Sequence, residues 1–560
     1  MTKKRVLIVG GVAGGASCAA RARRLDEDAE IIIFERGPYV SFANCGLPYY
    51  VGNVIQEEKK LLLSSPEMFK QRFNIDVRTE NEVVAIDRAA CEVEVKRVAT
   101  GERYRERYDA LVLAPGAAPI RPPLPGIDLP GIFTMRTVPD SNAIKARITE
   151  RRAKTAVVVG AGFIGLEAAE NFAHLGMKVT VIEMLDQVMP PLDAEMAEFV
   201  CRHLKEKQVD VRLSDAVAGF EQNKDGSLAI STRAGARFDA DLAILSVGVR
   251  PETALAKQAG LTIGERGGIK VDAQMRTNDP RIWAVGDAVE SLELVTGAPA
   301  VIPLAGPANR QGRIAADVIC GRNSRFRGMQ ATAVCGAFGL TIAMTGASEK
   351  TLRRAGIEYQ KIYTHPESHA GYYPGATRIH IKLLFSPKDG RVLGAQAVGG
   401  DGTEKRIDVI AMAMQMHATV FDLEEAELCY APQFGSAKDP VNMAGMAAAN
   451  ALRGDVRLAT WDGLAETDAV VVDVREPKEF AKEHVEGAIN IPLTQLRQRM
   501  RELPKDRDIF VYCVVGQRSY NAYRILRQNG YRVSNLPGGI STYLNLPPRM
   551  LRRSAGANGG

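Results

Sequence analysis

The sequence predicts a protein of the α/β class that contains at least three separate α/β units. Residues 5–35 have the pattern of a buried strand, a glycine-rich turn, a helix of small residues and a second strand. The same order returns at residues 154–183, and an apolar run at residues 469–473 opens a third unit. A chain of 560 residues has room for roughly three to five domains.

The composition is that of an ordinary globular protein, because 46% of the residues are hydrophobic and 25% are charged. The net charge of +6 is small for this length and does not by itself indicate nucleic-acid binding. No apolar run approaches the ~20 residues that a membrane-spanning helix needs. The apolar run at residues 6–9 is too short for a signal-peptide core, so a cytoplasmic location is predicted.

The first glycine-rich turn has the form of a dinucleotide site. Its glycines let the backbone approach a pyrophosphate, and the amides of the helix start then hold the negative charge. Glu35, at the end of the following strand, can accept a hydrogen bond from a ribose hydroxyl. Val12 stands where the G-x-G-x-x-G pattern has its second glycine. The candidate cofactor-binding residues of this turn are Gly10, Val12, Ala13, Gly14 and Gly15.

The second glycine-rich turn matches the same pattern in full. Its candidate cofactor-binding residues are Gly160, Gly162, Ile164 and Gly165. Glu183 closes the second strand, where a carboxylate binds the adenosine ribose of NADH and repels the extra phosphate of NADPH. The sequence therefore favours NADH over NADPH.

Two further segments complete a recognisable set. One contains Ala114 and Gly116, and the other reads as a strand that ends at Gly286-Asp287 and opens a helix. With the two turns, they make residues 1–450 resemble the flavoprotein disulfide reductases that carry two dinucleotide-binding domains. The resemblance implies that the first domain binds FAD and that the Gly-Asp pair contacts the ribityl chain and phosphates of FAD.

Cys45 is the first candidate redox thiol. It lies in the segment SFANCGLPYY, shortly after the ribose-binding strand. Dithiol enzymes of this kind have a second cysteine five positions later, but here that position is Tyr50. One thiol must therefore cycle through a mixed disulfide or a sulfenic acid. We expect amides of a helix start and the oxidised flavin to stabilise its thiolate.

The same segment closely resembles the single-cysteine branch of that family, which includes coenzyme A-disulfide reductases, NADH oxidases and NADH peroxidases. The first glycine turn lacks the histidine common in the oxidases and peroxidases, which favours the coenzyme A-disulfide reductases. That group is dimeric, so a homodimer is implied, with Tyr372 and Tyr430 lining the disulfide site of the other subunit. The substrate-binding candidates are Ser41 and Asn44, together with Arg23, Arg24, Lys70 and Arg72 for the phosphates of coenzyme A.

Cys513 is the second candidate thiol. It ends the strand at residues 509–513, and a short loop then leads into a helix. Such a thiol gains amide donors and the positive end of a helix dipole, and Arg518 adds a cation. Together with HVEGAINIP and a Pro-Gly-Gly segment, these residues closely resemble a rhodanese domain, in which Cys513 would carry the persulfide. No cysteine or histidine cluster has the spacing of a zinc site, and no metal is expected.

The predicted fold is α/β, with two Rossmann-like domains, an α+β dimerisation domain and a rhodanese-like domain. The expected boundaries are 1–118 and 251–328 for the FAD domain, 119–250 for the NAD(P)H domain, 329–451 for the dimerisation domain, 452–463 for a flexible linker, 464–550 for the rhodanese domain and 551–560 for a disordered tail.

The whole chain resembles fused coenzyme A-disulfide reductase–rhodanese proteins, also described as NADH-dependent persulfide reductases. Coenzyme A would then be a substrate or a tightly bound thiol. Two other functions stay open at this stage. One is an NADH oxidase or peroxidase with a passenger rhodanese domain, and the other is a non-catalytic sulfur carrier or redox adaptor.

Overall fold

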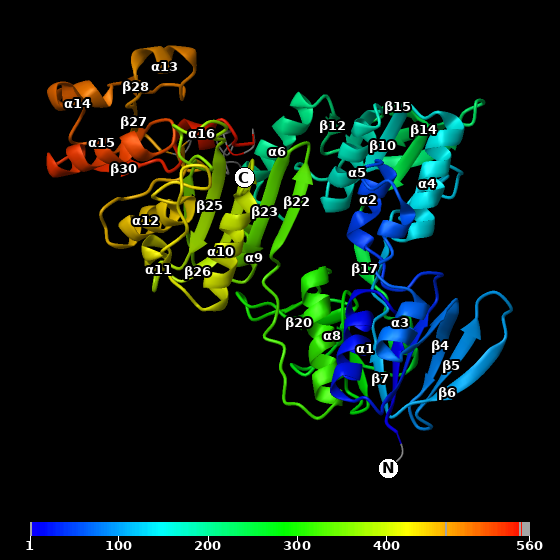
Figure 1. Ribbon diagram of the computed structural model, residues 1–560. Helices are drawn as coiled ribbons and strands as arrows, with labels where there is room; N and C mark the ends of the chain where they lie inside the picture. The colour runs from blue at the N-terminus through cyan, green and yellow to red at the C-terminus, as the bar shows by residue number, and fades with distance from the viewer. Residues whose placement is uncertain (1–2, 465–466, 548–549, 551–560) are drawn as a thin grey trace, which may run out of the picture. The chain divides into compact units, whose positions relative to one another are not determined.

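The structure is a computed structural model that describes residues 3–464, 467–547 and 550. The chain forms two compact units, residues 1–186 with 209–331 and residues 187–208 with 332–560 (Figure 1). The predicted disordered tail at residues 551–560 lies outside the described residues.

The first sheet of unit 1 is parallel and holds the first glycine-rich turn. Its strands, in spatial order, are β19 (Ile282–Ala284), β7 (Ala110–Leu113), β1 (Arg5–Val9), β2 (Glu30–Glu35) and β3 (Asp76–Thr79). Helices α1 (Ala13–Leu25) and α8 (Ala305–Ile319) pack so closely that a Cβ on Gly312 would lie 2.2 Å from the Gly14 carbonyl oxygen. Strands β1 and β2 with α1 form the predicted strand–turn–helix–strand unit.

The second sheet of unit 1 repeats this design around the second turn. Its strands are β12 (Asp210–Arg212), β11 (Lys178–Ile182), β10 (Thr155–Val159), β16 (Leu242–Leu245) and β9 (Ile132–Phe133). Helices α4 (Val138–Arg151) and α5 (Phe163–His174) belong to this domain. A turn at Asp225-Gly226 joins β13 (Val217–Gln222) to β14 (Leu228–Thr232), and β15 (Arg237–Ala240) completes that antiparallel sheet.

The remaining elements of unit 1 are short or lie at its edges. They are η1 (Asn44–Gly46), α2 (Leu47–Val51), η2 (Glu58–Lys60), α3 (Pro66–Phe73), β4 (Asn81–Asp87), β5 (Glu92–Arg97), β6 (Arg103–Arg107), β8 (Ala117–Pro119), β17 (Val249–Pro251), α7 (Ala254–Gln258), β18 (Ile269–Lys270), β20 (Val289–Leu292) and β21 (Pro299–Ala300). One prediction is wrong here. The Gly286-Asp287 turn leads into β20 and not into a helix, because residues 289–290 pair with β18.

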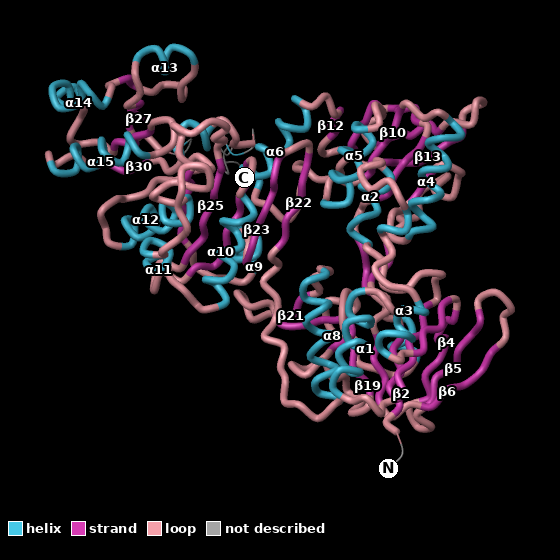
Figure 2. The backbone as a smooth tube through the Cα atoms, viewed as in Figure 1, coloured by secondary structure: helices cyan, strands magenta, loops and turns pink. Residues whose placement is uncertain are grey.

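Unit 2 contains an antiparallel sheet with helices beside it (Figure 2). Its strands are β22 (Ala333–Ala337), β23 (Leu340–Gly346), β26 (Val392–Gly399), β25 (Ile379–Phe385) and β24 (Gln360–Thr364). Its helices are α6 (Ala194–Glu206), α9 (Glu349–Arg354), α10 (Thr403–Gln415), α11 (Val420–Glu425) and α12 (Pro440–Leu452). Helix α12 is built largely from small residues. We call this sheet with its helices the interface domain.

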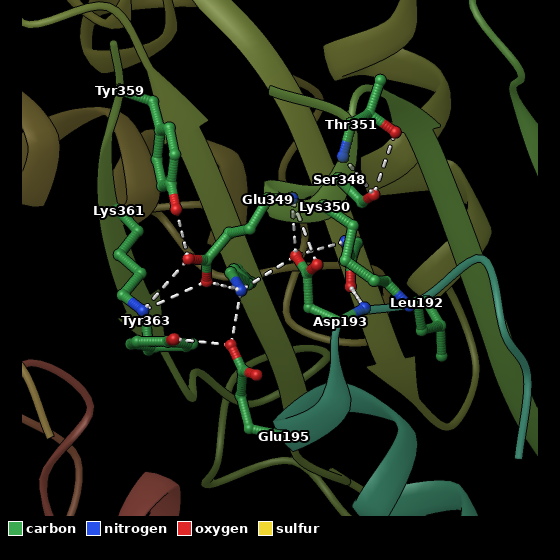
Figure 3. A network of polar contacts seen from close by, with 12 residues as sticks. Leu192, Asp193, Glu195, Ser348, Glu349, Lys350, Thr351, Tyr359, Lys361 and Tyr363 are labelled. Atoms are coloured by element: carbon green, nitrogen blue, oxygen red, sulfur yellow. Dashed lines mark hydrogen bonds and ion pairs between the residues drawn. The ribbon is translucent and has the colours of Figure 1, made fainter. Parts of the chain in front are cut away.

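A buried ionic cluster joins the start of α6 to the antiparallel sheet of unit 2 (Figure 3). The Lys382 side chain on β25 is fully buried. Its ammonium lies 2.9 Å from the Asp193 carboxylate and contacts the carboxylates of Glu195 and Glu349. Removing one partner would leave a buried charge uncompensated, so the cluster holds the start of α6 against the sheet.

The C-terminal domain of unit 2 is a parallel sheet with short helices. Its strands are β28 (Ile489–Asn490), β27 (Val470–Asp473), β29 (Ile509–Tyr512) and β30 (Val533–Asn535). Its helical segments are α13 (Pro477–Lys482), α14 (Leu493–Arg499), η4 (Met500–Glu502), α15 (Gln517–Gln528) and α16 (Gly539–Tyr543). The predicted strand, loop and helix around Cys513 are β29, residues 513–516 and α15.

The segment expected to be a flexible linker, residues 452–463, is packed. The side chains of Val456, Ala459 and Trp461 are buried, and the Trp461 indole donates a hydrogen bond to the Pro537 carbonyl at 2.9 Å. The Ala459 amide donates to the carbonyl of Asn535, the last residue of β30, at 2.9 Å. Arg453, Arg457 and Thr460 of this segment are exposed, which gives it the polar sequence of a linker.

Candidate active sites

The first glycine turn can accept a pyrophosphate. Gly10 has φ 95°, and a Cβ there would lie 2.1 Å from the Ala114 carbonyl oxygen. The predicted segment around Ala114 therefore lies directly against the turn. The Glu35 carboxylate accepts hydrogen bonds from the amides of Gly11 and Gly37, each at 2.9 Å, which holds it beside the turn. Each oxygen keeps lone-pair capacity for a ribose hydroxyl.

The Gly286-Asp287 turn also fits the flavin cofactor. Burial raises the pKa of Asp287, and only a more distant interaction with Arg136 lowers it. No hydrogen bond to its carboxylate is found among the described residues, so this half-buried acceptor can take hydroxyl donors such as those of a ribityl chain. The Gly286 amide is held by the Gln311 side chain of α8 at 2.8 Å. These residues would hold FAD.

The second turn has the same construction as the first. Gly160 has φ 100°, and Gly162 is the residue that precedes α5. The buried Glu183 carboxylate accepts from the amides of Ala161 at 2.7 Å and Leu185 at 2.8 Å. This places a negative charge where the 2′-phosphate of NADPH would lie, which supports the expected preference for NADH.

Cys45 is exposed and has no thiol at the fifth following position. It lies in η1. The side-chain amide of Asn44, in the same element, donates a hydrogen bond to the Arg136 carbonyl at 2.5 Å. Tyr50 is buried, and its hydroxyl lies 3.2 Å from Asn142 Oδ1. Ser41 has φ 50° and donates its amide to the Gly11 carbonyl at 2.8 Å, which ties the thiol segment to the first turn.

The protein groups around Cys45 shift the pKa of its thiol in both directions. Burial raises the pKa of the Cys45 thiol, and the carboxylates of Glu167 and Asp287 raise it further, whereas the local amide acts in the opposite direction. Burial also raises the pKa of Glu167 to about 7, despite a hydrogen bond from Tyr49. Sequence reasoning missed Glu167, although it follows the second turn directly.

The predicted phosphate-binding residues divide into two groups. Arg24 and Arg72 line a cleft of about 380 Å³, which we call the arginine cleft. Its lining also includes the substrate-binding candidate Ser41, Arg313, and Arg21, which pairs with Asp317 at 2.7 Å. Lys70 lies outside this lining and bonds to Asn74 Oδ1 at 2.8 Å.

The prediction for Arg23 is wrong. Its side chain is buried and donates to five backbone carbonyls, including those of Phe73 at 2.7 Å and Ala29 at 2.7 Å. Because these carbonyls use its donors, Arg23 joins α1 to the end of α3 and cannot reach a ligand in the cleft.

Tyr372 and Tyr430 are brought together in unit 2. Their hydroxyls lie 3.1 Å apart, and 76% and 50% of the two residues are exposed. The hydrogen bond between the two hydroxyls raises the pKa of Tyr372. The pair can therefore present one hydroxyl proton to an external group while the other hydroxyl supports it.

Cys513 lies at the base of a loop that closes over its sulfur. The thiol is 1% exposed, and the Gly516 amide donates to Sγ at 3.2 Å. Gly516 has φ 103° and precedes α15, so the helix start faces the sulfur. An anionic sulfur at this position is favoured by the amide and by the helix dipole.

Arg518 is not a free cation. Both of its terminal nitrogens bond to the Glu479 carboxylate of α13 at 2.7 Å, and this contact lowers the pKa of Glu479 to about 2. The fork geometry makes the pair rigid. Arg518 therefore fixes the first turn of α15 and also contributes positive charge near Cys513. Sequence reasoning did not predict that Glu479 pairs with it.

A pair of dinucleotide turns that share a chain with an exposed thiol is typical of oxidoreductases that pass reducing equivalents from a pyridine nucleotide to sulfur. Residues 4–301 match the pyridine nucleotide-disulphide oxidoreductase model, and residues 332–440 match the dimerisation domain of that family. Residues 459–546 match the rhodanese-like domain. The chain belongs to the pyridine nucleotide-disulphide oxidoreductase family and is an FAD-dependent enzyme.

Individual relatives cover nearly all of the fold. A coenzyme A disulfide reductase of Staphylococcus haemolyticus (strain JCSC1435) is 37% identical over 79% of this chain and 98% of its own length. The reduced CoADR-RHD structure from Bacillus anthracis has a TM-score of 0.96 and 47% identity, covering 98% of this chain and 99% of that one. An NAD-dependent persulfide reductase of A. fulgidus has a TM-score of 0.90 and 39% identity, covering 96% and 100%. The predicted fold class is confirmed.

Within the described part of the chain, no helix is both long and apolar enough to cross a membrane. The cytoplasmic location stays a prediction.

Proposed function

We propose that this enzyme uses NADH to reduce coenzyme A disulfide and coenzyme A persulfide at Cys45, and that Cys513 accepts and delivers sulfane sulfur. The observation that carries the proposal is the combination of the exposed Cys45 thiol, which has no cysteine five positions later, with the arginine cleft. Ser41, four residues before Cys45, lines that cleft. A ligand with a phosphate-bearing end and a thiol end matches this pair of features.

The chemistry at Cys45 balances with one NADH for each substrate. The Cys45 thiolate attacks one sulfur of coenzyme A disulfide, which forms a mixed disulfide and releases a coenzyme A thiolate. With coenzyme A persulfide, attack on the inner sulfur releases hydrosulfide instead. FAD, when bound, accepts the electron pair of NADH and supplies it to the disulfide. The products are two coenzyme A thiols in the first case, and one thiol and one sulfide in the second.

At Cys513 the sulfur moves without a net change in redox state. The thiolate attacks the outer sulfur of a persulfide or polysulfide, which leaves a Cys513 persulfide and a shortened donor. A coenzyme A thiol then takes the outer sulfur and becomes coenzyme A persulfide, the substrate of Cys45. The Gly516 amide and the start of α15 favour the anionic sulfur in both steps.

The same proposal includes a homodimer. The exposed Tyr372 and Tyr430 lie in unit 2 with the exposed large apolar side chains of Met412, Met416 and Phe434. These residues lie in the segment that matches the dimerisation domain of the family, which supports an interface here. In the dimer, Tyr430 of the partner subunit would protonate the thiolate that leaves when Cys45 attacks.

The phosphate-binding role of the arginine cleft is tested by comparing coenzyme A disulfide with pantethine, which has the same reactive arms without the nucleotide phosphates. We expect kcat/KM for pantethine to be lower by roughly 10²-fold or more, because several charge-assisted hydrogen bonds are lost. Arg72→Ala should reduce the difference, with Lys70→Ala as the matched control outside the cleft. Equal kcat/KM values for the two disulfides would exclude coenzyme A recognition by the cleft.

The tyrosine pair gives a second test. Tyr430→Phe removes only a hydroxyl, and we expect kcat for coenzyme A disulfide to fall by roughly 10²–10⁴-fold because a general acid is lost. Reduction of the flavin by NADH, followed by stopped-flow absorbance, should keep its wild-type rate. Tyr373→Phe, at the neighbouring exposed tyrosine, is the control. An unchanged kcat in Tyr430→Phe would leave the pair with a packing role only.

A further inference from the structure

Helix α16 forms one wall of the Cys513 site. The Ile540 amide donates to the Cys513 carbonyl at 2.8 Å, and the Ser541 amide donates to the Val514 carbonyl at 3.1 Å. Gly539 has φ 60° and lies so close that a Cβ there would be 2.3 Å from the Cys513 carbonyl oxygen. The first turn of α16 therefore holds the backbone from which the sulfur-carrying loop begins.

The same helix contacts the interface domain through Thr542. The buried Thr542 hydroxyl lies 2.9 Å from Nε2 of His365, the residue that follows β24. Nδ1 of His365 lies 2.8 Å from Nδ1 of His380 on β25. Phe199 of α6 stacks on the His380 ring with a centroid separation of 4.0 Å. These residues form a continuous row from α6 to the rhodanese helix.

Both histidines in this row are suited to be neutral. Burial, the neighbouring His380 and Arg378 lower the pKa of His365 well below its ordinary value. Burial and Arg378 lower the pKa of His380 to about 4. A neutral imidazole offers one donor and one acceptor nitrogen, so His365 can bond to His380 and Thr542 at the same time.

The approach of the two domains at this point is close. Gly538 has φ 71°, and a Cβ there would lie 2.7 Å from Cβ of Tyr363 and 2.9 Å from Nε2 of His365. The Tyr363 hydroxyl in turn bonds to Glu195 of the buried ionic cluster at 2.6 Å. The Leu544 carbonyl at the end of α16 accepts a hydrogen bond from Arg202 of α6. The interface domain thus supports α16 along its whole length.

We propose that His365 is a positioning residue for the rhodanese reaction, acting through Thr542 and α16 on the backbone of Cys513. This inference rests on the proposed role of Cys513 in sulfur transfer. It makes the sulfur-transfer site a composite of the rhodanese and interface domains, and it accounts for a packed connection between them where a flexible linker was expected.

The test uses the full-length holoenzyme with thiosulfate as sulfur donor and cyanide as acceptor, and follows thiocyanate. Thr542→Val keeps the shape of the side chain without its hydroxyl. We expect kcat to fall by roughly fivefold to tenfold, with an unchanged KM for thiosulfate and unchanged reduction of coenzyme A disulfide. Thr542→Ser should restore kcat, and Thr494→Val, at an exposed threonine of α14, should not alter it.

The row is tested further with His365→Ala alone and combined with Thr542→Val. If the two residues act as one contact, the double variant should be no slower than the more affected single variant. A wild-type kcat in both single variants would overturn the positioning role. A fall in kcat that parallels a fall in the thermal midpoint, and that Thr542→Ser does not restore, would also overturn it. Thiocyanate formation by Cys513→Ser at the wild-type rate would overturn the role of Cys513 itself.

Discussion

Replacement of Cys45 by serine should abolish turnover of both coenzyme A disulfide and coenzyme A persulfide. A hydroxyl cannot form the mixed disulfide, and no second thiol stands at the position of Tyr50. We expect kcat to fall by at least roughly 10³-fold, as for the loss of an enzyme nucleophile. Steady-state NADH oxidation under anaerobic conditions measures the effect.

The flavin should still bind and be reduced by NADH in this variant, because Cys45 takes no part in either glycine turn. Cys91→Ser is the matched control, since Cys91 is a half-buried thiol of the same unit that bonds to Arg281. Turnover of either substrate at more than a few per cent of the wild-type rate in Cys45→Ser would contradict the proposed mechanism.

Replacement of Cys513 by serine should separate the two sulfur reactions. Reduction of plain coenzyme A disulfide needs only Cys45 and should keep its wild-type rate. Sulfide release from polysulfide should fall by at least roughly tenfold, because the sulfur no longer reaches coenzyme A through a Cys513 persulfide. Parallel assays of NADH consumption and sulfide release from the same samples measure both effects.

Cys335→Ser is a suitable control for this variant, because Cys335 is also a buried thiol of unit 2 but lies on β22 of the interface domain. Sulfide release at the wild-type rate in Cys513→Ser would place the rhodanese domain outside the reductase reaction. The NADH oxidase or peroxidase with a passenger rhodanese domain would then be favoured.

Local sequence signals predicted the parts of both sites that depend on neighbouring residues. The two glycine turns, Glu35 and Glu183 follow from the strand–turn–helix–strand pattern, and the structure places both carboxylates against their turns. The loop after Cys513 follows from a strand end and a helix start. Each of these features is set by residues close together in the chain, where apolar periodicity and glycine carry the information.

Contacts between distant segments could not be predicted in this way. Arg23 has the appearance of a surface cation, but its donors meet carbonyls at the end of α3. Arg518 has the appearance of a free charge, but Glu479 pairs with it from another helix. The segment at residues 452–463 has the local sequence of a linker. Its partner is not apparent there, because the β30 carbonyl that accepts a hydrogen bond from the Ala459 amide comes much later in the chain. The charge and polarity of a residue indicate whether it favours solvent, but they do not identify the residue from a distant segment that it contacts.

The central claim is that NADH oxidation by this protein is coupled to reduction of a coenzyme A disulfide or persulfide bond. The most direct test is to compare the rates of anaerobic NADH oxidation with four substrates: coenzyme A disulfide, coenzyme A persulfide, polysulfide and peroxide. The thiol and sulfide formed in each reaction are measured in the same samples. The account predicts two coenzyme A thiols for each NADH with the disulfide, and one thiol and one sulfide with the persulfide. Fastest oxidation with peroxide, without thiol or sulfide formation from the sulfur substrates, would contradict it.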